Sequence, residues 1–262
     1  MSKSLTILGA GYTARFLLPL AARHYARVLA TSRDPDRQLN HLAPDRRIGF
    51  DLTQQETWKH IPTETDLLWC FPAMPHDLVR EFTATLAPLS RRLVVLGSTS
   101  AYKIGASIEY PPPWIDETAP VDPAKPRVRS EEFLRSDCGA IVLRVAGIYG
   151  PGRNPLDWIR TGRVSPSRKF VNLIHVEDLA AVCLAALEQA TAGEPYNVSD
   201  GTPRTWKEIC VTAQQRWKVP LKPAVPDNNN NKGKRISIAK LTKDLRYTIR
   251  YPDLYEVLEK IE

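Results

Sequence analysis

The chain has 262 residues, of which 43% are hydrophobic and 25% are charged, and this suits one large domain or one domain with a smaller appendage. No apolar run reaches the roughly 18–20 residues that a membrane helix needs, and the short, glycine-broken apolar start lacks a signal-peptide layout. The formal net charge of +7 comes from scattered basic residues. We attribute this charge to a solvated surface rather than a nucleic-acid interface, with a few charges left for a phosphate-bearing ligand.

Four cysteines, Cys70, Cys138, Cys183 and Cys210, lie far apart in the sequence. They form no Cys-x-x-Cys pair, which argues against a zinc site or a disulfide framework and for reduced, mostly buried thiols. We therefore expect a cytoplasmic protein without a metal site.

The first predicted element is a short apolar strand that runs into a glycine turn and then a helical pattern. Gly9 permits the tight turn, Gly11 lets the backbone approach a pyrophosphate, and Ala14 lets the helix pack close to the strand. The N–H groups at the helix start, at Tyr12 and Thr13, would bind the pyrophosphate. The alternative is an ordinary strand–turn–helix in which the glycines serve only the turn.

A second strand is predicted at 27–31, and its end bears on the cofactor. An NAD site usually has an acidic residue here for the ribose 2′-hydroxyl, whereas an NADP site prefers Arg near the 2′-phosphate. Arg33 lies 22 positions after Gly11, and Ser32 adds a second donor, so the sequence favours NADP. Asp34 keeps NAD open, and Arg33 could also be a loop residue that faces water.

Further strands are predicted at 47–50, 66–71, 92–97 and 140–144, alternating with helical segments. This alternation implies βαβ units and a parallel sheet, in which ligands bind beyond the carboxyl ends of the strands.

Candidate cofactor residues follow two of these strands. Asp51 and Leu52 come after the first, where the carboxylate could accept a hydrogen bond from an adenine amino group or serve only the turn. Phe71 and Pro72 stand at the end of the second.

The remaining chain is expected to hold a proline-rich loop at 104–125 and helices at 127–138, 176–189 and 205–216. Capping boxes are predicted at Thr53/Glu56 and Thr205/Glu208. Strands are expected at 170–174 and 196–198, a polar loop at Asn228–Asn231, and short helices from 238 to the end.

Together, several stretches resemble the extended, epimerase/dehydratase-like branch of the short-chain dehydrogenase/reductase superfamily. They are 116–120, 143–152, 174–180, 196–201 and 234–241. The resemblance implies an α/β fold with a Rossmann-type doubly wound parallel sheet, an NAD(P) cofactor and a small C-terminal substrate-binding part. We expect the NAD(P)-binding domain at 1–150, completed by 170–190, and the substrate-binding part mainly at 151–262.

Two departures from this family's pattern concern the cofactor turn and the catalytic helix. The branch usually has Gly-x-x-Gly-x-x-Gly, and here the turn is Gly9-x-Gly11-x-x-Ala14. The family's reaction uses Tyr-x-x-x-Lys, but alignment through Ser130 places Arg127 and Glu131 at those positions. At this spacing the two side chains face each other on a helix, as a functional pair or only as a stabilising one.

Three other residues are candidates for chemistry. Ser98 matches the family's catalytic serine, and Tyr102 is a candidate replacement proton donor, although the family's tyrosine there is usually structural. His175 could act as an acid or base, but a structural role at a strand end is the stronger interpretation.

The sequence therefore predicts an NADP-dependent oxidoreductase or epimerase/dehydratase-like enzyme that acts on a small, sugar-like substrate. The alternative is a non-catalytic NADP-binding sensor or regulator. We expect a small-molecule partner and neither nucleic acid nor membrane, and the sequence is compatible with a homodimer.

Overall fold

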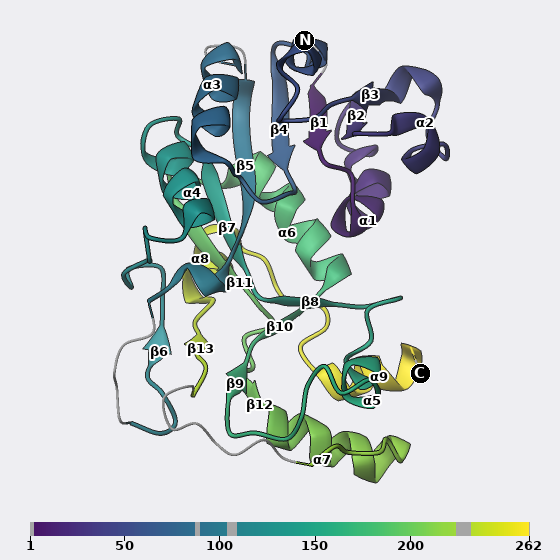
Figure 1. The fold of residues 1–262 in the computed structure, drawn as a ribbon, viewed down its shortest axis with the longest axis vertical. Helices are drawn as coiled ribbons and strands as arrows, with labels where there is room; N and C mark the ends of the chain where they lie inside the picture. Colours follow the sequence, from purple (N-terminus) through teal and green to yellow (C-terminus); the bar gives the residue numbers. More distant parts are fainter. Residues whose placement is uncertain (1–2, 87–89, 104–108, 224–231, 262) are drawn as a thin grey trace.

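The structure is a computed structural model that describes residues 3–86, 90–103, 109–223 and 232–261. Within these residues, seven strands form one parallel sheet in the order β11-β7-β5-β4-β1-β2-β3 (Figure 1). They are β1 (Ser4–Leu8), β2 (Arg27–Ser32), β3 (Arg47–Gly49), β4 (Thr65–Trp69), β5 (Ser90–Ser98), β7 (Ile141–Val145) and β11 (Pro195–Val198). Strands β4 and β7 are buried along their whole length, as expected of parallel strands covered on both faces.

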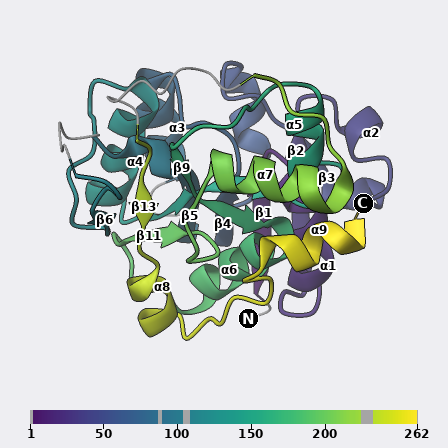
Figure 2. The same cartoon turned by 90° about the horizontal axis from the view of Figure 1, so that it is seen from below.

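Helices cover both faces of the sheet (Figure 2). One face packs on α1 (Tyr12–Ala21) and α6 (Val176–Gln189), and the other on α3 (His76–Leu86) and α4 (Pro126–Ser136). The short helix α2 (Pro35–Gln38) follows β2. The strands thus present their carboxyl ends at one edge, which is where a doubly wound sheet binds ligands.

A smaller part lies beyond that edge, in the lower half of Figure 1. It contains three two-stranded sheets and has its own hydrophobic cluster among the described residues. The pairs are β8 (Gly147–Tyr149) with β10 (Leu173–His175), β9 (Phe170–Val171) with β12 (Arg204–Thr205), and β6 (Trp114–Ile115) with β13 (Arg235–Ile236). Its helices are α5 (Pro155–Arg160), α7 (Trp206–Trp217) and α9 (Leu254–Ile261). Helix α8 (Ala239–Asp244) packs on the sheet instead, where Leu241 and Leu245 join the cluster of α1 and α6.

The fold class predicted from the sequence is confirmed, and some local predictions are corrected. Thr53 does not cap a helix: its backbone N–H and hydroxyl both donate to Asp51, and a 3-10 helix begins later, at Gln55–His60. The proline-rich segment contributes the strand β6, and Asn228–Asn231 lie outside the described residues. Helix α6 packs against α1 on the sheet, and β11, beyond residue 190, adds an edge strand.

The four cysteines are free, but only Cys183 and Cys210 are buried, whereas Cys138 is exposed. In the part of the chain that the structure describes, no helix is long and apolar enough to cross a membrane.

Candidate functional site

The turn after β1 has the geometry that a dinucleotide pyrophosphate needs. Gly9 has a φ of +79°, and a Cβ there would lie 2.7 Å from Cδ1 of Phe71, so only glycine fits. Gly11 is the N-cap of α1, and no side chain of the described residues caps this helix. A Cβ at Gly11 would meet no described protein atom within 4 Å, so this backbone is open to a ligand. Ala14 is fully buried against the core.

The end of β2 is built around the start of α2. The Ser32 hydroxyl donates to Gln38 Oε1 at 2.5 Å and accepts from the Asp34 N–H at 3.1 Å, and Ser32 is buried. Asp34 caps α2 by accepting from the Arg37 N–H at 3.3 Å. Arg33 is exposed. Of the two charged residues that bear on the cofactor type, Asp34 thus has its carboxylate occupied by the helix cap, whereas Arg33 is exposed.

The predicted adenine-side residues lie at the end of β3. Asp51 accepts from the Thr53 N–H at 2.9 Å, and this bond, helped by the Arg33 guanidinium, holds the pKa of Asp51 below its usual value. Arg33 therefore lies near Asp51 across the ends of neighbouring strands. Leu52 is buried in the sheet core, where its carbonyl accepts from Trp58 Nε1 at 3.2 Å.

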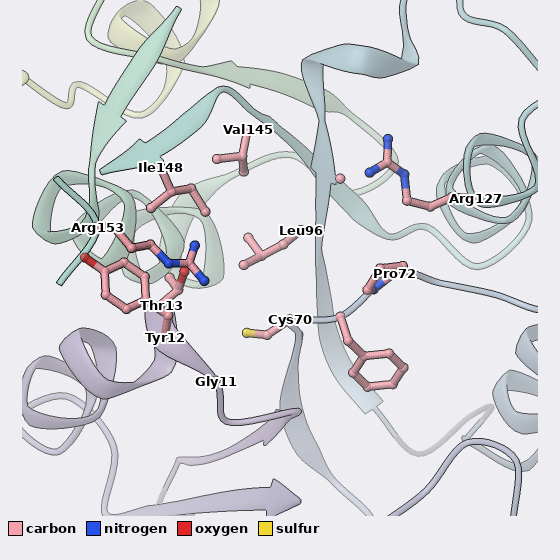
Figure 3. Close-up of a pocket in the computed structure, with 12 residues that line it drawn as sticks. Gly11, Tyr12, Thr13, Cys70, Pro72, Leu96, Arg127, Val145, Ile148 and Arg153 are labelled. Atoms are coloured by element: carbon pink, nitrogen blue, oxygen red, sulfur yellow. The ribbon is translucent and has the colours of Figure 1, made fainter. Parts of the chain in front are cut away.

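A central cleft runs from the first turn along the carboxyl edge of the sheet to α4. It is lined by Gly11, Tyr12, Thr13, Cys70, Phe71, Pro72, Leu96, Gly97, Arg127, Val145, Ile148 and Arg153. Figure 3 shows Arg127 on one side and Tyr12 with Arg153 on the other. Sequence reasoning placed six of these residues at the site, from the turn, the end of β4 and α4. Four other predicted cofactor residues do not line this cleft: Ser32, Arg33, Asp51 and Leu52.

Arg153 is a cleft residue that sequence reasoning missed. Its guanidinium lies 4.2 Å from the centroid of the Tyr12 ring, and the Tyr12 hydroxyl donates to the Pro151 carbonyl at 3.0 Å. The two contacts join α1 to the segment after β8. The only sequence signal was the position of Arg153 directly after Gly150-Pro151-Gly152.

The aligned pair on α4 forms an ion pair at the cleft, in which the carboxylate is buried. Arg127 Nε lies 2.9 Å from Glu131 Oε1, and Glu131 is only 1% exposed. Its carboxylate packs on β5 so closely that a Cβ at Gly97 would lie 2.8 Å from Oε2. Burial raises the pKa of Glu131 to about 7, although the attraction of Arg127 and Arg144 opposes this.

Ser98 connects to this pair through Ser100. The Ser98 hydroxyl accepts from the Ser100 N–H at 3.1 Å and donates to Ser100 Oγ at 3.2 Å. Ser100 Oγ in turn accepts from Arg127 Nη2 at 3.0 Å. The structure thus brings Ser98, Arg127 and Glu131 into one polar chain at the end of β5.

Tyr102 lies apart from that chain. It is fully buried, and its hydroxyl donates to Asn197 Oδ1 at 2.6 Å and accepts from Arg144 Nη1 at 3.0 Å. Burial raises its pKa. Both bonds tie β7 and β11 to the turn after β5, so this placement favours the structural role over the candidate role of proton donor.

His175 is buried between two tyrosine rings, with centroids 5.3 Å from Tyr149 and 4.1 Å from Tyr251. Its Nδ1 has no hydrogen-bond partner among the described residues, and burial lowers its pKa. His175 does not line the central cleft, and its burial at the end of β10 favours the structural role.

Comparison with known proteins supports the fold. No protein-family model matches the chain. Protein YeeZ of Escherichia coli (strain K12) is 28% identical over 179 residues, which are 65% of this chain and 62% of that protein. The match therefore spans less than two thirds of that relative's length.

Three solved structures share the architecture over almost the whole chain. A conserved protein of unknown function from Silicibacter pomeroyi DSS has 26% identity and a TM-score of 0.78, covering 99% of this chain and 98% of that one. A protein from Methylobacillus flagellatus, assigned as an NAD-dependent epimerase/dehydratase, has 21% identity and a TM-score of 0.77, covering 99% and 97%. A short-chain dehydrogenase/reductase superfamily protein from Agrobacterium tumefaciens, with bound NAD, has 13% identity and a TM-score of 0.78, covering 98% and 95%.

The chain therefore has the fold of the short-chain dehydrogenase/reductases and NAD-dependent epimerase/dehydratases, and the predicted resemblance is confirmed at that level.

Proposed function

We propose that this protein is an NADP-dependent oxidoreductase or epimerase/dehydratase-like enzyme that acts on a small, sugar-like substrate. One observation carries the proposal: a single cleft joins the glycine turn at Gly11 to Arg127 on α4, beside the Glu131 carboxylate. A dinucleotide with its pyrophosphate on the turn would extend along this edge toward the polar chain at Ser98.

The cofactor would be held mainly by backbone and by the side chains at the strand ends. The N–H groups at the start of α1 would bind the pyrophosphate, and the Gly11 backbone gives it room. We assign the 2′-phosphate of NADP to Arg33. The engagement of Asp34 as the cap of α2 supports this assignment, because a capping carboxylate is less available to a ribose hydroxyl.

The chemistry would proceed without the family's tyrosine. The bound nicotinamide supplies or accepts a hydride, and this chain's own residues bind the substrate oxygen. Ser98 would donate a hydrogen bond to that oxygen, and the Arg127 guanidinium would stabilise negative charge that develops on it. Glu131 holds Arg127 in place, and its raised pKa of about 7 lets it hold or release a proton near neutral pH.

A non-catalytic NADP-binding sensor is the second candidate. The observation that favours it is the residue at position 127: a guanidinium, always protonated, replaces the phenol that passes the proton in this family.

Fluorescence titration with NADPH and NADH tests the cofactor assignment. We expect tighter binding of NADPH, and Arg33→Asp should weaken NADPH binding by roughly tenfold or more, as expected for one charge-assisted contact, while sparing NADH. Arg23→Asp, an exposed arginine just beyond the C-terminal end of α1, is the matched control and should change neither affinity. Equal losses for both cofactors in Arg33→Asp would refute the NADP assignment.

Turnover separates the enzyme from the sensor. Protein loaded with NADPH is offered aldehydes, ketones and nucleotide sugars, and oxidation is followed by the loss of nicotinamide absorbance. We expect oxidation with at least one class and a loss of rate in Arg127→Met with NADPH affinity retained. Tight NADPH binding without oxidation in any class would favour the sensor.

A further inference from the structure

Three basic side chains from separate parts of the chain converge on the 3-10 turn Thr99–Ala101, directly after Ser98. Lys125 Nζ donates to the Ser100 carbonyl at 2.7 Å. Arg127 Nη2 donates to Ser100 Oγ at 3.0 Å, and Lys234 Nζ donates to the Thr99 carbonyl at 3.1 Å. The turn that ends β5 is therefore surrounded by cations.

Lys234 is the least expected member, because it lies 135 positions after Thr99 in the sequence. It immediately precedes β13, and the Asn172 side chain holds this backbone from both sides. Asn172 Nδ2 donates to the Lys234 carbonyl at 2.9 Å, and its Oδ1 accepts from the Ile236 N–H at 3.0 Å. The lysine is thus positioned by a buried clamp rather than projecting freely from the surface.

The charges around Lys234 are of its own sign. Burial and the nearby ammonium groups of Lys125 and Lys169 lower the pKa of Lys234 to about 8. No carboxylate forms an ion pair with Lys234 in the described part of the chain. The acids beside the other two cations are engaged with them: Asp122 lies 3.7 Å from Lys125, and Glu131 pairs with Arg127.

We name Lys125, Lys169 and Lys234 the cationic cluster, and we propose that it binds an oxyanion of the substrate, a phosphate or a carboxylate. Like charges that lie together repel one another, and Lys234 is in addition half-buried without a carboxylate partner among the described residues. Both effects cost free energy, which a bound anion would offset. An ammonium has three N–H donors, and Thr99 occupies one of them, so two remain for anion oxygens.

This inference rests on the proposed function for the position of the reacting group. The anion would lie at the turn, and the substrate oxygen would then fall near Ser98, one residue before Thr99. The substrate class is accordingly a small carbonyl or hydroxyl compound that carries a phosphate or carboxylate group, in which the charged end fixes the orientation of the reacting end.

Calorimetric titration of the whole protein with inorganic phosphate tests the cluster. Saturation with NADP⁺ first occupies the cofactor's own phosphate sites, and sodium acetate is titrated in a parallel series at constant ionic strength. We expect saturable binding of at least one anion. Its affinity should fall roughly tenfold in Lys234→Met, because the loss of one charge-assisted contact corresponds to about 1.4 kcal/mol of binding free energy. Lys243→Met, an exposed lysine on α8, should bind like the wild type.

The anion series identifies the charged group: binding of phosphate indicates a phosphorylated substrate, and binding of acetate alone indicates a carboxylate. Lys125→Met should also weaken binding, which guards against a fold defect peculiar to Lys234→Met. The inference is overturned if neither anion binds saturably. It is also overturned if Lys234→Met and Lys243→Met bind the anion with equal affinity. If NADP⁺ itself does not bind, the proposed function fails. The same comparison of anion affinity on the cofactor-free protein then still shows whether the cationic cluster binds an anion.

Discussion

At the scale of single residues, Glu131 links stability to the chemistry of the cleft. Its carboxylate is packed against Gly97, where it loses water, and Arg127 is the one cation that pairs with it among the described residues. Burial raises its pKa from 4.5 to about 7. Between these two pH values the folded chain keeps a proton that the unfolded chain has released. The contribution of Glu131 to stability is therefore fully present below about pH 4.5 and is lost as pH rises through about 7.

Glu131→Gln should remove this pH dependence, because the amide mimics the protonated acid. Relative to wild type, the variant's free energy of unfolding should rise by about 1–3 kcal/mol between pH 5 and pH 8. Urea unfolding of both proteins across this range measures the difference. Glu256→Gln, an exposed acid on α9, should run parallel to wild type. A constant difference between Glu131→Gln and wild type at every pH would contradict the buried, partly protonated carboxyl.

At the scale of elements, sequence patterns predicted those helix limits and caps that depend on contacts between residues close in sequence. The helix expected at 176–189 has these limits in the structure, and Thr205 caps α7 by accepting from the Glu208 N–H at 3.1 Å. The equivalent expectation for Thr53 is wrong, because its hydroxyl turns back to donate to Asp51 and the 3-10 helix begins one residue later, with Gln54 as its N-cap.

The candidate site follows the same division. The glycine turn and the Arg127–Glu131 pair are local motifs, so they could be predicted from spacing alone. The environment of Tyr102 could not, because its partners Arg144 and Asn197 lie 42 and 95 positions away. Lys234 was likewise hidden, since its place at the turn depends on a pairing of distant two-residue strands.

The two hydrogen bonds by which the Asn172 side chain holds β13 can be tested directly. Asn172→Leu would leave the Lys234 carbonyl and the Ile236 N–H without their partner, at a cost of about 1–3 kcal/mol each in unfolding free energy. Amide hydrogen exchange at Ile236 should speed up in this variant. Asn172→Asp keeps the acceptor, so Ile236 should stay protected although stability falls. Unchanged exchange at Ile236 in Asn172→Leu would show that β13 is held by other contacts.

At the scale of the whole molecule, one buried carboxylate joins the smaller part to the sheet. Asp178 stands in the first turn of α6 and is fully buried. It accepts from the Tyr247 hydroxyl at 2.7 Å and from the N–H groups of Arg250 and Tyr251 at 2.9 and 3.0 Å. These residues lead into α9, which belongs to the hydrophobic cluster of the smaller part. The helix that covers the sheet therefore also fixes the end of the chain.

Asp178→Ala should loosen this junction more than any single surface change, because two backbone N–H groups and a hydroxyl lose a charged acceptor together. We expect a loss of about 3–5 kcal/mol in unfolding free energy and a thermal midpoint lower by roughly 10 °C. Glu188→Ala, near the other end of α6, removes only the exposed contact with His24 and should cost under about 1 kcal/mol. Asp178→Asn should fall between them, since its amide oxygen keeps an acceptor for Tyr247 and Arg250. Calorimetric unfolding measures all three, and equal losses from Asp178→Ala and Glu188→Ala would show that the two parts are joined elsewhere.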